Sequence, residues 1–313
     1  MARVVNPALR GSGVRGTAGL LEVPTYLSFS QLTKLSSRYR NSCPRAWAYN
    51  KLLGLPGGVG NGMILGRSLD NAVTSFFQRR ILGDDFEHAY DAASREIPAA
   101  INADGNGFED NAKRERSEYV DLMGRAFAAF TEAYATHIPA SLQHDHVYEV
   151  RTEGFGNVRM VGYSDWIDAD GVINDLKWSG APKWDADGVW YEDYLAQVRD
   201  QICTYYMGRV YAERMGVLDA TAPVVPRGRV VVVTGKVNSK TVQVKTHDFE
   251  FTDELVKEIA DAVREAVEIA HADRHPARPG GMCSYCPYLE RCRNDSARYT
   301  VQTAALAIPL PVK

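Results

Sequence analysis

The stretch GYSDWIDADGVINDLKW, residues 162–178, decides the fold, because it predicts a β-hairpin that carries charged side chains. Its turn spans residues 168–172 and fits a three-residue hairpin loop, with Gly171 in the left-handed conformation that glycine adopts without strain. The register that follows from this loop sets Asp165 directly opposite Asp175. Opposed residues of an antiparallel pair point to the same face of the sheet, so we expect the two carboxylates to lie side by side.

Lys177 should join the two aspartates, because residues two apart on a strand share a face. The preceding turn, at residues 154–156, is a second candidate for a three-residue loop and would set Glu149 opposite Val161, on that same face. The hairpin therefore predicts a cluster of carboxylates with one lysine beside them.

Such a cluster suits metal-assisted hydrolysis of phosphodiesters. Carboxylates crowded on one face raise one another's pKa unless a cation neutralises them, and hard oxygen ligands suit magnesium or manganese. A neighbouring lysine can orient a water molecule or stabilise charge on a scissile phosphate. The alternative is a surface hairpin with a salt bridge, since Asp-x-Lys alone is a weak pattern.

The chain around the hairpin alternates between helical and strand periodicity. Helices are expected within residues 28–37, 43–54, 61–137, 191–215 and 252–271, and strands at residues 146–153, 157–168, 172–178, 229–234 and 241–248. Ser28-x-x-Gln31 matches a capping box, and Thr252 or Asp253 should cap the last helix. We expect an α/β protein with these parts: an irregular segment 1–27, a helical region 28–140, a core 141–273, a cysteine segment 274–293 and a tail 294–313.

Composition and charge exclude few classes of protein. The 313 residues are 45% hydrophobic and 24% charged, as in soluble globular proteins, with no apolar run long enough to span a membrane. Residues 1–20 carry arginines in place of the apolar stretch of a signal peptide, so we expect a cytoplasmic protein. The net charge of -3 does not indicate a nucleic-acid partner, but residues 23–69 and 274–298 are rich in Lys and Arg. These stretches are either solvated faces or nucleic-acid contacts.

Four segments, in the same order, resemble the PD-(D/E)XK nuclease superfamily, and within it the RecB-like exonucleases, including CRISPR-associated members with an iron–sulfur cluster. They are LSFSQLTKLSSRYRNSCPRAWAYNKLLGLP at residues 27–56, Asp165 with the Asp175-Leu176-Lys177 strand, Gln201-x-x-x-Tyr205, and Cys283-x-x-Cys286-x(5)-Cys292. The resemblance implies a restriction-endonuclease-like core, a mixed sheet flanked by helices, with a cluster that joins N- and C-terminal segments.

The resemblance also implies an activity, that of a metal-dependent DNA exonuclease acting on single-stranded ends. Asp165, Asp175 and Lys177 would form the catalytic centre. Gln201 and Tyr205 would address it together, because residues four apart share a helix face. By analogy alone, the partners would be single-stranded DNA, a second copy of the chain, or proteins of a phage, recombination or CRISPR system.

One position departs from the family pattern. The family usually places a metal-binding histidine four residues after a glycine, but here Gly66 leads to Asp70. A carboxylate still ligates magnesium or manganese, whereas histidine suits softer transition metals, so the metal preference stays open. Asp70 is therefore either a further metal ligand, beside Asp165 and Asp175, or a solvent-facing aspartate. Ser164 also stands where the motif has its proline.

The chain has five cysteines, and an odd count in an intracellular protein argues for metal or cluster ligation rather than a disulfide framework. Cys283, Cys286 and Cys292 need a fourth ligand to close a tetrahedral site, and Cys43 is the candidate. Spacing does not separate zinc from a [4Fe–4S] cluster, but the resemblance favours the cluster, in a structural role. Cys203 lies among apolar neighbours and should be a small buried residue.

Two further alternatives stay open. The loop after Lys177 is rich in aromatic side chains: Trp178, Trp184, Trp190 and Tyr191, with Lys183 among them. These aromatics either stack on exposed DNA bases or pack beneath a long loop. The rival function is a non-catalytic nucleic-acid-binding protein with a degenerate nuclease fold and a zinc or iron–sulfur site, which the aspartate at position 70 favours.

Overall fold

The computed structural model describes residues 26–57, 60–103, 114–153, 155–180, 189–218, 221–272 and 275–299, without the side chains of residues 189–191 and 296–299. These residues form two compact units. The first unit lies within residues 1–58, 148–161 and 257–313, and the second within residues 59–147 and 162–256. Strand β3 (Gly156–Ile167) contributes to both units. None of the described helices combines the length and the apolar character needed to cross a bilayer.

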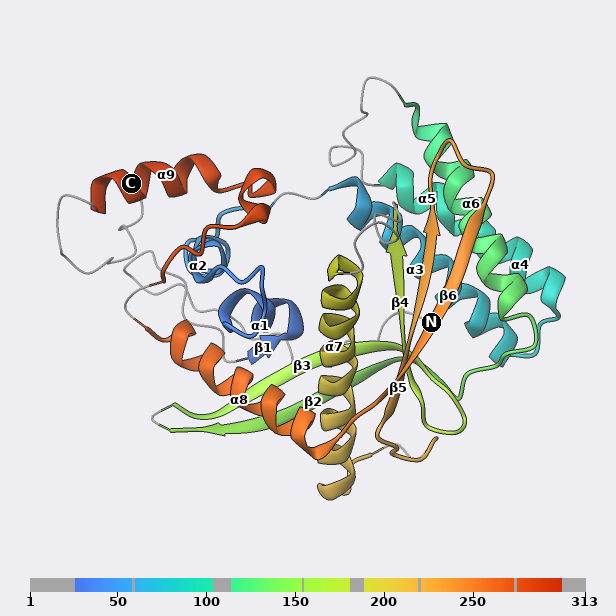
Figure 1. Ribbon diagram of the computed structural model, residues 1–313. Coiled ribbons are helices and arrows are strands. Elements are labelled where there is room, and N and C mark those ends of the chain that lie inside the picture. The colour runs from blue at the N-terminus through green and yellow to red at the C-terminus, as the bar shows by residue number, and fades with distance from the viewer. Residues whose placement is uncertain are drawn as a thin grey trace. The chain divides into compact units, whose positions relative to one another are not determined.

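The first unit holds the short N-terminal elements and the C-terminal helices (Figure 1). Its elements are β1 (Tyr26–Ser28), α1 (Phe29–Leu35), α2 (Pro44–Lys51), the end of β2 (Ser141–Thr152), the start of β3, most of α8 (Asp253–Ala270), the 3-10 helix η2 (Gly281–Tyr285) and α9 (Leu289–Tyr299). β1 runs parallel to β3, with Tyr26 opposite Arg159.

The start of the chain's described part differs from the sequence prediction. Residues 26–27 belong to β1 rather than to an irregular segment, because a strand of 3 residues is too short to show alternation. Ser28 precedes α1 but makes no capping hydrogen bond, and its hydroxyl contacts Ser30 Oγ at 2.9 Å. Gln31 Oε1 accepts a hydrogen bond from Trp47 Nε1 at 3.1 Å. The predicted capping box is therefore wrong, because a tertiary contact takes the glutamine side chain.

The predictions for the end of the chain are partly confirmed. The Leu255 backbone amide donates to Thr252 Oγ1 at 3.2 Å, so Thr252 caps α8 as expected. Helix α9 reaches Tyr299, within residues that the sequence suggested were a tail. Its sequence, LERCRNDSARY, has no apolar stripe from which a helix could be predicted.

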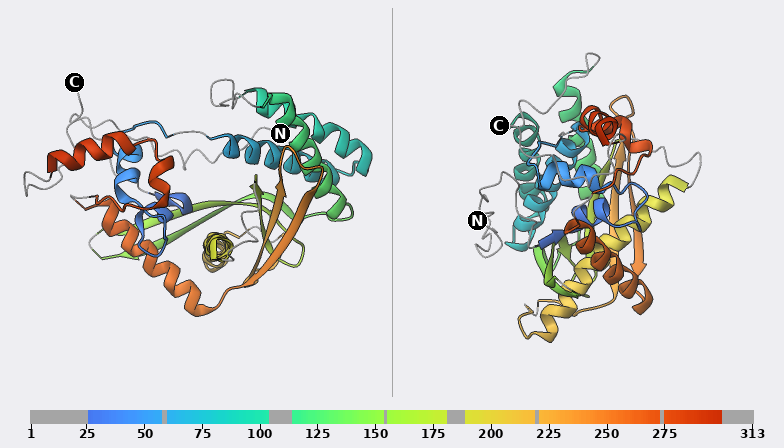
Figure 2. Two further views of the ribbon diagram at one scale, coloured as in Figure 1. Left: turned by 45° about the horizontal axis from the view of Figure 1, so that its top comes forward. Right: turned by 90° about the vertical axis from the view of Figure 1, so that its left-hand side faces the viewer.

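The second unit is a mixed sheet with helices on both faces (Figures 1 and 2). Its elements are α3 (Asn61–Ile81), α4 (Phe86–Ser94), α5 (Glu96–Ala103), α6 (Arg116–Ala133), the start of β2, the end of β3, β4 (Ile173–Ser179), α7 (Val189–Arg214), β5 (Arg227–Gly235) and β6 (Val242–Glu250). β3 pairs antiparallel with β4, β4 parallel with β5, and β5 antiparallel with β6. The predicted α/β class, with a mixed sheet flanked by helices, is confirmed.

The two faces of this sheet bury different helices. Leu176, Val231 and Val233 belong to one core with buried residues of α3, α4, α5 and α6. On β5, Gly228 lies against α7, where an added Cβ would come within 2.5 Å of Ile202 Cγ2. Helix α7 therefore covers the face that α3 and α6 leave open, as both figures show.

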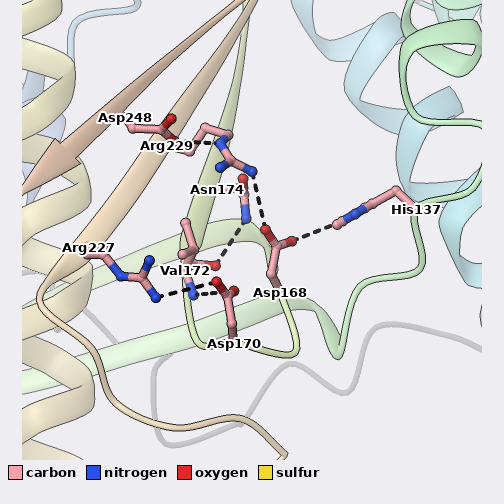
Figure 3. Close-up of polar contacts among 8 residues, drawn as sticks. All are labelled: His137, Asp168, Asp170, Val172, Asn174, Arg227, Arg229 and Asp248. Atoms are coloured by element: carbon pink, nitrogen blue, oxygen red, sulfur yellow. Dashed lines mark hydrogen bonds and ion pairs between the residues drawn. The ribbon is translucent and has the colours of Figure 1, made fainter.

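The β3–β4 turn has the geometry that the sequence predicted. The Asp168 backbone amide donates to the Val172 carbonyl at 3.0 Å, and Gly171 has a φ of 87°. The Asp168 carboxylate lies 2.9 Å from His137 Nε2 and 3.5 Å from Arg229 Nη1 (Figure 3). These contacts hold the turn, and the turn sets the register between β3 and β4.

Candidate active site

Asp165 and Asp175 lie on β3 and β4, one residue beyond the last pair that joins the two strands. Trp166 and Asn174 form this last pair of the ladder. The backbone amide of Leu176 donates to Asp165 Oδ2 at 2.5 Å, so a side chain of β3 reaches the backbone of β4. The hairpin thus brings the two carboxylates together.

Lys177 forms an ion pair within this cluster. Its Nζ lies 2.5 Å from Asp175 Oδ2, and the two side chains are 26% and 2% exposed. Burial alone would lower the pKa of Lys177, but the carboxylates of Asp175 and Asp165 outweigh burial and raise this pKa above its ordinary value. The lysine is therefore a permanent positive charge beside the aspartates.

The carboxylates are held in an unfavourable environment. Burial raises the pKa of Asp165 well above its ordinary value, and the charges of Asp175 and Asp70 raise it further. Burial also raises the pKa of Asp175, against the lowering effect of Lys177. Carboxylates in this state favour either a proton or a nearby cation. Their carboxylate oxygens are hard donors, which suit a divalent cation such as magnesium or manganese.

Asp70 comes to this cluster from α3. The helix buries the neighbouring Ser68 and Leu69 in the core and leaves Asp70 partly buried. Its charge acts on Asp165, which places the two carboxylates within electrostatic reach. The structure thus brings Asp70 toward the aspartate of β3.

Gln201 and Tyr205 reach the cluster from α7. Gln201 Nε2 donates to Asp175 Oδ1 at 3.3 Å and to the Tyr205 hydroxyl at 2.5 Å. Burial and the charge of Asp175 raise the pKa of Tyr205, which keeps its hydroxyl protonated. The spacing of four residues on one helix face therefore delivers both polar groups to the same aspartate.

Three residues near the cluster escaped the sequence analysis: His146, Gly162 and Gly208. His146 Nε2 lies 2.8 Å from Ser164 Oγ, and the His146 ring stacks on Tyr205 with centroids 5.2 Å apart. A signal for His146 was present in the alternation of β2, because positions 146, 148 and 150 are all buried. A histidine at a buried strand position needs a hydrogen-bond partner.

The sequence analysis also proposed Glu149 and several aromatic residues near the site, and the described ones make contacts elsewhere. In the first unit, the Glu149 carboxylate accepts from Asn157 Nδ2 at 2.9 Å and lies 3.5 Å from Arg159 Nε. Trp178 packs against the core that includes α3 and α6. The predictions for Lys183, Trp184, Trp190 and Tyr191 concern side chains outside the described residues.

The other candidate site lies in the first unit. Cys43, Cys283, Cys286 and Cys292 line one cavity of about 430 Å³. All are free thiols with partly exposed side chains. Burial raises the pKa of Cys286, and the three neighbouring cysteines add to the effect. Cys43, which is far from the other three cysteines in the sequence, thus lies in the same cavity as they do.

The donor set of this cavity fits a thiolate-bound metal or cluster. Arg45 Nη1 lies 3.8 Å from Cys292 Sγ, and the Gly280 amide donates to Cys283 Sγ at 3.4 Å. N–H groups in such positions stabilise sulfur atoms that bind a metal. Across the residues that the structure describes, no three His, Cys, Asp or Glu side chains are spaced as around a bound metal ion. Cys203 is fully buried on α7, as expected of a packing residue.

Comparison with known proteins assigns this chain to a family. Residues 26–293 match the PD-(D/E)XK nuclease superfamily. The crystal structure of SSO0001 is similar at 12% identity and a TM-score of 0.38, over 85% of this chain and 85% of that chain. A Eubacterium rectale protein, described provisionally as an exonuclease, is similar at 14% identity and a TM-score of 0.45, over 85% and 88%. The comparison with curated proteins gave no match. Because the family match covers most of the sequence, this chain belongs to the PD-(D/E)XK nuclease superfamily.

Proposed function

We propose that this chain is a metal-dependent DNA exonuclease that hydrolyses phosphodiester bonds at single-stranded ends. Membership of a nuclease superfamily gives the reaction class. The observation that carries the proposal is the placement of Asp165 and Asp175 together, with Lys177 Nζ 2.5 Å from Asp175. Buried acidic groups with raised pKa values cost stability, and such arrangements cluster at functional sites.

Magnesium or manganese would be held by Asp70, Asp165 and Asp175, as one ion or two. A bound ion lowers the pKa of a coordinated water and offsets the charge that develops on the scissile phosphate. The Leu176 amide occupies Oδ2 of Asp165, which leaves Oδ1 for a cation. An aspartate at position 70, in place of histidine, favours a hard cation over softer transition metals.

The remaining polar groups would serve the reaction in separate ways. Lys177, held protonated by its aspartate neighbours, positions the attacking water and places positive charge near the phosphate. Gln201 holds Oδ1 of Asp175 through its amide. The Tyr205 hydroxyl accepts from Gln201, so its own hydrogen stays available for a substrate oxygen.

An exposed aromatic residue supports a single-stranded substrate. Tyr163 lies on β3, two residues before Asp165, and its side chain is 52% exposed. Bases of single-stranded DNA stack on such rings, whereas bases within a duplex are stacked on one another. The resemblance to RecB-like exonucleases supports the same substrate.

A [4Fe–4S] cluster bound by Cys43, Cys283, Cys286 and Cys292 is the second part of the proposal. The shared cavity and the resemblance support the cluster, while zinc remains the alternative for four thiolate ligands. When bound, it would tie the N-terminal α2 segment to the C-terminal η2–α9 segment. A cytoplasmic location, and a second copy or recombination or CRISPR proteins as partners, are proposed on the resemblance alone.

The rival is a non-catalytic nucleic-acid-binding protein with a degenerate nuclease fold. The substitution of aspartate for the family's histidine at position 70 favours it. The ion pair of Lys177 with Asp175, and the nearby charge of Asp165, support a catalytic protein instead.

A cutting assay separates these functions. Labelled linear single-stranded, linear double-stranded and circular single-stranded DNA are incubated with the purified protein in manganese, magnesium or EDTA. We expect metal-dependent shortening of the linear single strand and no attack on the circle. Equal cutting of the circle would replace exonuclease with endonuclease action, and binding without cutting in either metal would establish the rival.

A further inference from the structure

We propose that His146 and Gly162 are positioning residues that hold Tyr205 in place. Through Tyr205 they set the amide of Gln201 against Asp175, so the inference rests on the metal site proposed above. Neither residue belongs to the carboxylate cluster. Neither lies in the four segments on which the resemblance to the family rests.

His146 links Tyr205 to the strand that carries Asp165. Its ring stacks on the Tyr205 ring at 5.2 Å with an interplanar angle of 15°, and the residue is 2% exposed. Its Nε2 lies 2.8 Å from the hydroxyl of Ser164, the residue directly before Asp165. A phenylalanine at this position could stack, but it could not make this hydrogen bond. The imidazole therefore fixes the tyrosine ring relative to β3.

Two glycines make room for this stack. A Cβ at Gly162 would lie 2.4 Å from Tyr205 Cε1, and a Cβ at Gly208 would lie 2.8 Å from His146 Cβ, both closer than real Cβ contacts come. Neither glycine has a positive φ, so the backbone at both positions would accept alanine. What the fold requires there is space, and a side chain at residue 162 would push the tyrosine ring away.

The consequence reaches Asp175 through hydrogen bonds. Gln201 Nε2 donates both to the Tyr205 hydroxyl, at 2.5 Å, and to Asp175 Oδ1, at 3.3 Å. The other oxygen, Asp175 Oδ2, faces Lys177. A displaced tyrosine removes one of the two partners that orient the amide, and Oδ1 then loses its donor. Losing such an outer partner of a metal ligand typically weakens metal binding or activity by about 10–100-fold.

Manganese binding without DNA tests this role directly. Calorimetry is done on the full-length, anaerobically purified protein and on its His146→Ala, Gly162→Ala and Gly228→Ala variants. Gly228→Ala is the matched control, because its Cβ would crowd α7 at Ile202 Cγ2, at 2.5 Å, and Phe251 Cζ, at 2.7 Å, and Tyr205 is not among its three nearest neighbours. We expect the Kd for manganese to rise about 10–100-fold in the first two variants. The control should lose stability but keep its Kd.

A double-mutant cycle separates positioning from general loosening. Tyr205→Phe removes the hydroxyl, and His146→Ala should add no further loss of manganese affinity in that background, because both act through one hydrogen bond. Should His146→Ala fail to fold, His146→Phe keeps the stack, loses the Ser164 contact and should show a smaller rise in Kd.

Unchanged manganese affinity in the folded His146 and Gly162 variants, or losses that add to that of Tyr205→Phe, would overturn the inference. A wild-type protein that binds manganese but cuts no DNA would refute the proposed nuclease activity and leave the positioning role standing. A wild-type protein that binds no manganese would overturn both.

Discussion

Lys177 Nζ lies 2.5 Å from Asp175 Oδ2, although the two residues are only two apart on β4 and Asp175 is almost fully buried. One ammonium group here faces two carboxylates, because Asp165 lies across the strand pair. With both carboxylates ionised, the cluster would carry a net negative charge in a buried place. Such a charge is costly without a further cation, and the stability of the metal-free protein should reveal that cost.

Removing one carboxylate should stabilise the metal-free protein. Asp165→Asn keeps an oxygen for the Leu176 amide and removes repulsion from Asp175 and Asp70. We expect the free energy of unfolding in EDTA to rise by about 1 kcal/mol, as at other functional sites that trade stability for activity. Urea denaturation measures it. Asp170, whose side chain is 59% exposed, provides the control: Asp170→Asn should change the free energy of unfolding little. A less stable Asp165→Asn protein would contradict the prediction.

Loss of one cysteine should empty the proposed cluster site. Cys43→Ser is expected to abolish bound iron and visible absorbance in anaerobically purified protein and to lower its Tm, since a bound metal or cluster stabilises the folded state. Cys203→Ser, on α7, serves as the control and should keep the metal content. Zinc in place of iron would reject the cluster but keep the site. Unchanged metal content in Cys43→Ser would reject Cys43 as a ligand.

Stability should fall in mild acid because of His146. Burial lowers its pKa well below the ordinary value, and the charges of His144 on β2 and Arg209 on α7 lower it further. The unfolded chain then takes up a proton near pH 6.5 that the folded chain refuses. Stability is thus complete above that pH and falls below it, by up to about 1.4 kcal/mol per pH unit.

Urea unfolding at pH 7 and pH 5 measures this effect. The loss of unfolding free energy between the two pH values should be smaller in His146→Phe than in the wild type. Because both proteins contain the other histidines, comparing them cancels the contribution of those residues. Equal losses in both proteins would show that His146 is not the group responsible.

The exposed ring of Tyr163, two residues before Asp165 on β3, should affect substrate choice. Tyr163→Ala should weaken binding of single-stranded DNA by about 10-fold, since stacking of one base contributes roughly 1–3 kcal/mol. Binding of duplex DNA should change much less. Fluorescence anisotropy in calcium, in a background that carries Asp175→Asn, measures both affinities without cutting. An equal loss for both substrates would contradict a stacking role.

The β3–β4 hairpin could be predicted because local chemistry determines it. A glycine at position 171 sets the turn, the turn sets the register, and the register brings Asp165 and Asp175 to the positions just beyond the last strand pair. The Gln201 and Tyr205 pair followed from helix periodicity in the same way. These features need only short-range geometry, which residue type and spacing specify.

Features that depend on tertiary contacts could not be predicted in this way. His146 meets Tyr205 only because α7 packs where it does, and Gly162 matters only because that ring lies beside it. The expected capping box at Ser28 failed for the same reason, since Trp47 takes the glutamine at position 31. Local propensity is a weak guide wherever a distant side chain offers a competing partner.

The rate of metal-dependent DNA hydrolysis in Asp175→Asn and Lys177→Met tests the central claim most directly. Each variant should remain folded, by circular dichroism, and should cut labelled single-stranded DNA at least about 100-fold more slowly than the wild type. Asp170→Asn should cut at the wild-type rate. Full activity in either folded variant would show that this strand pair is not the catalytic centre.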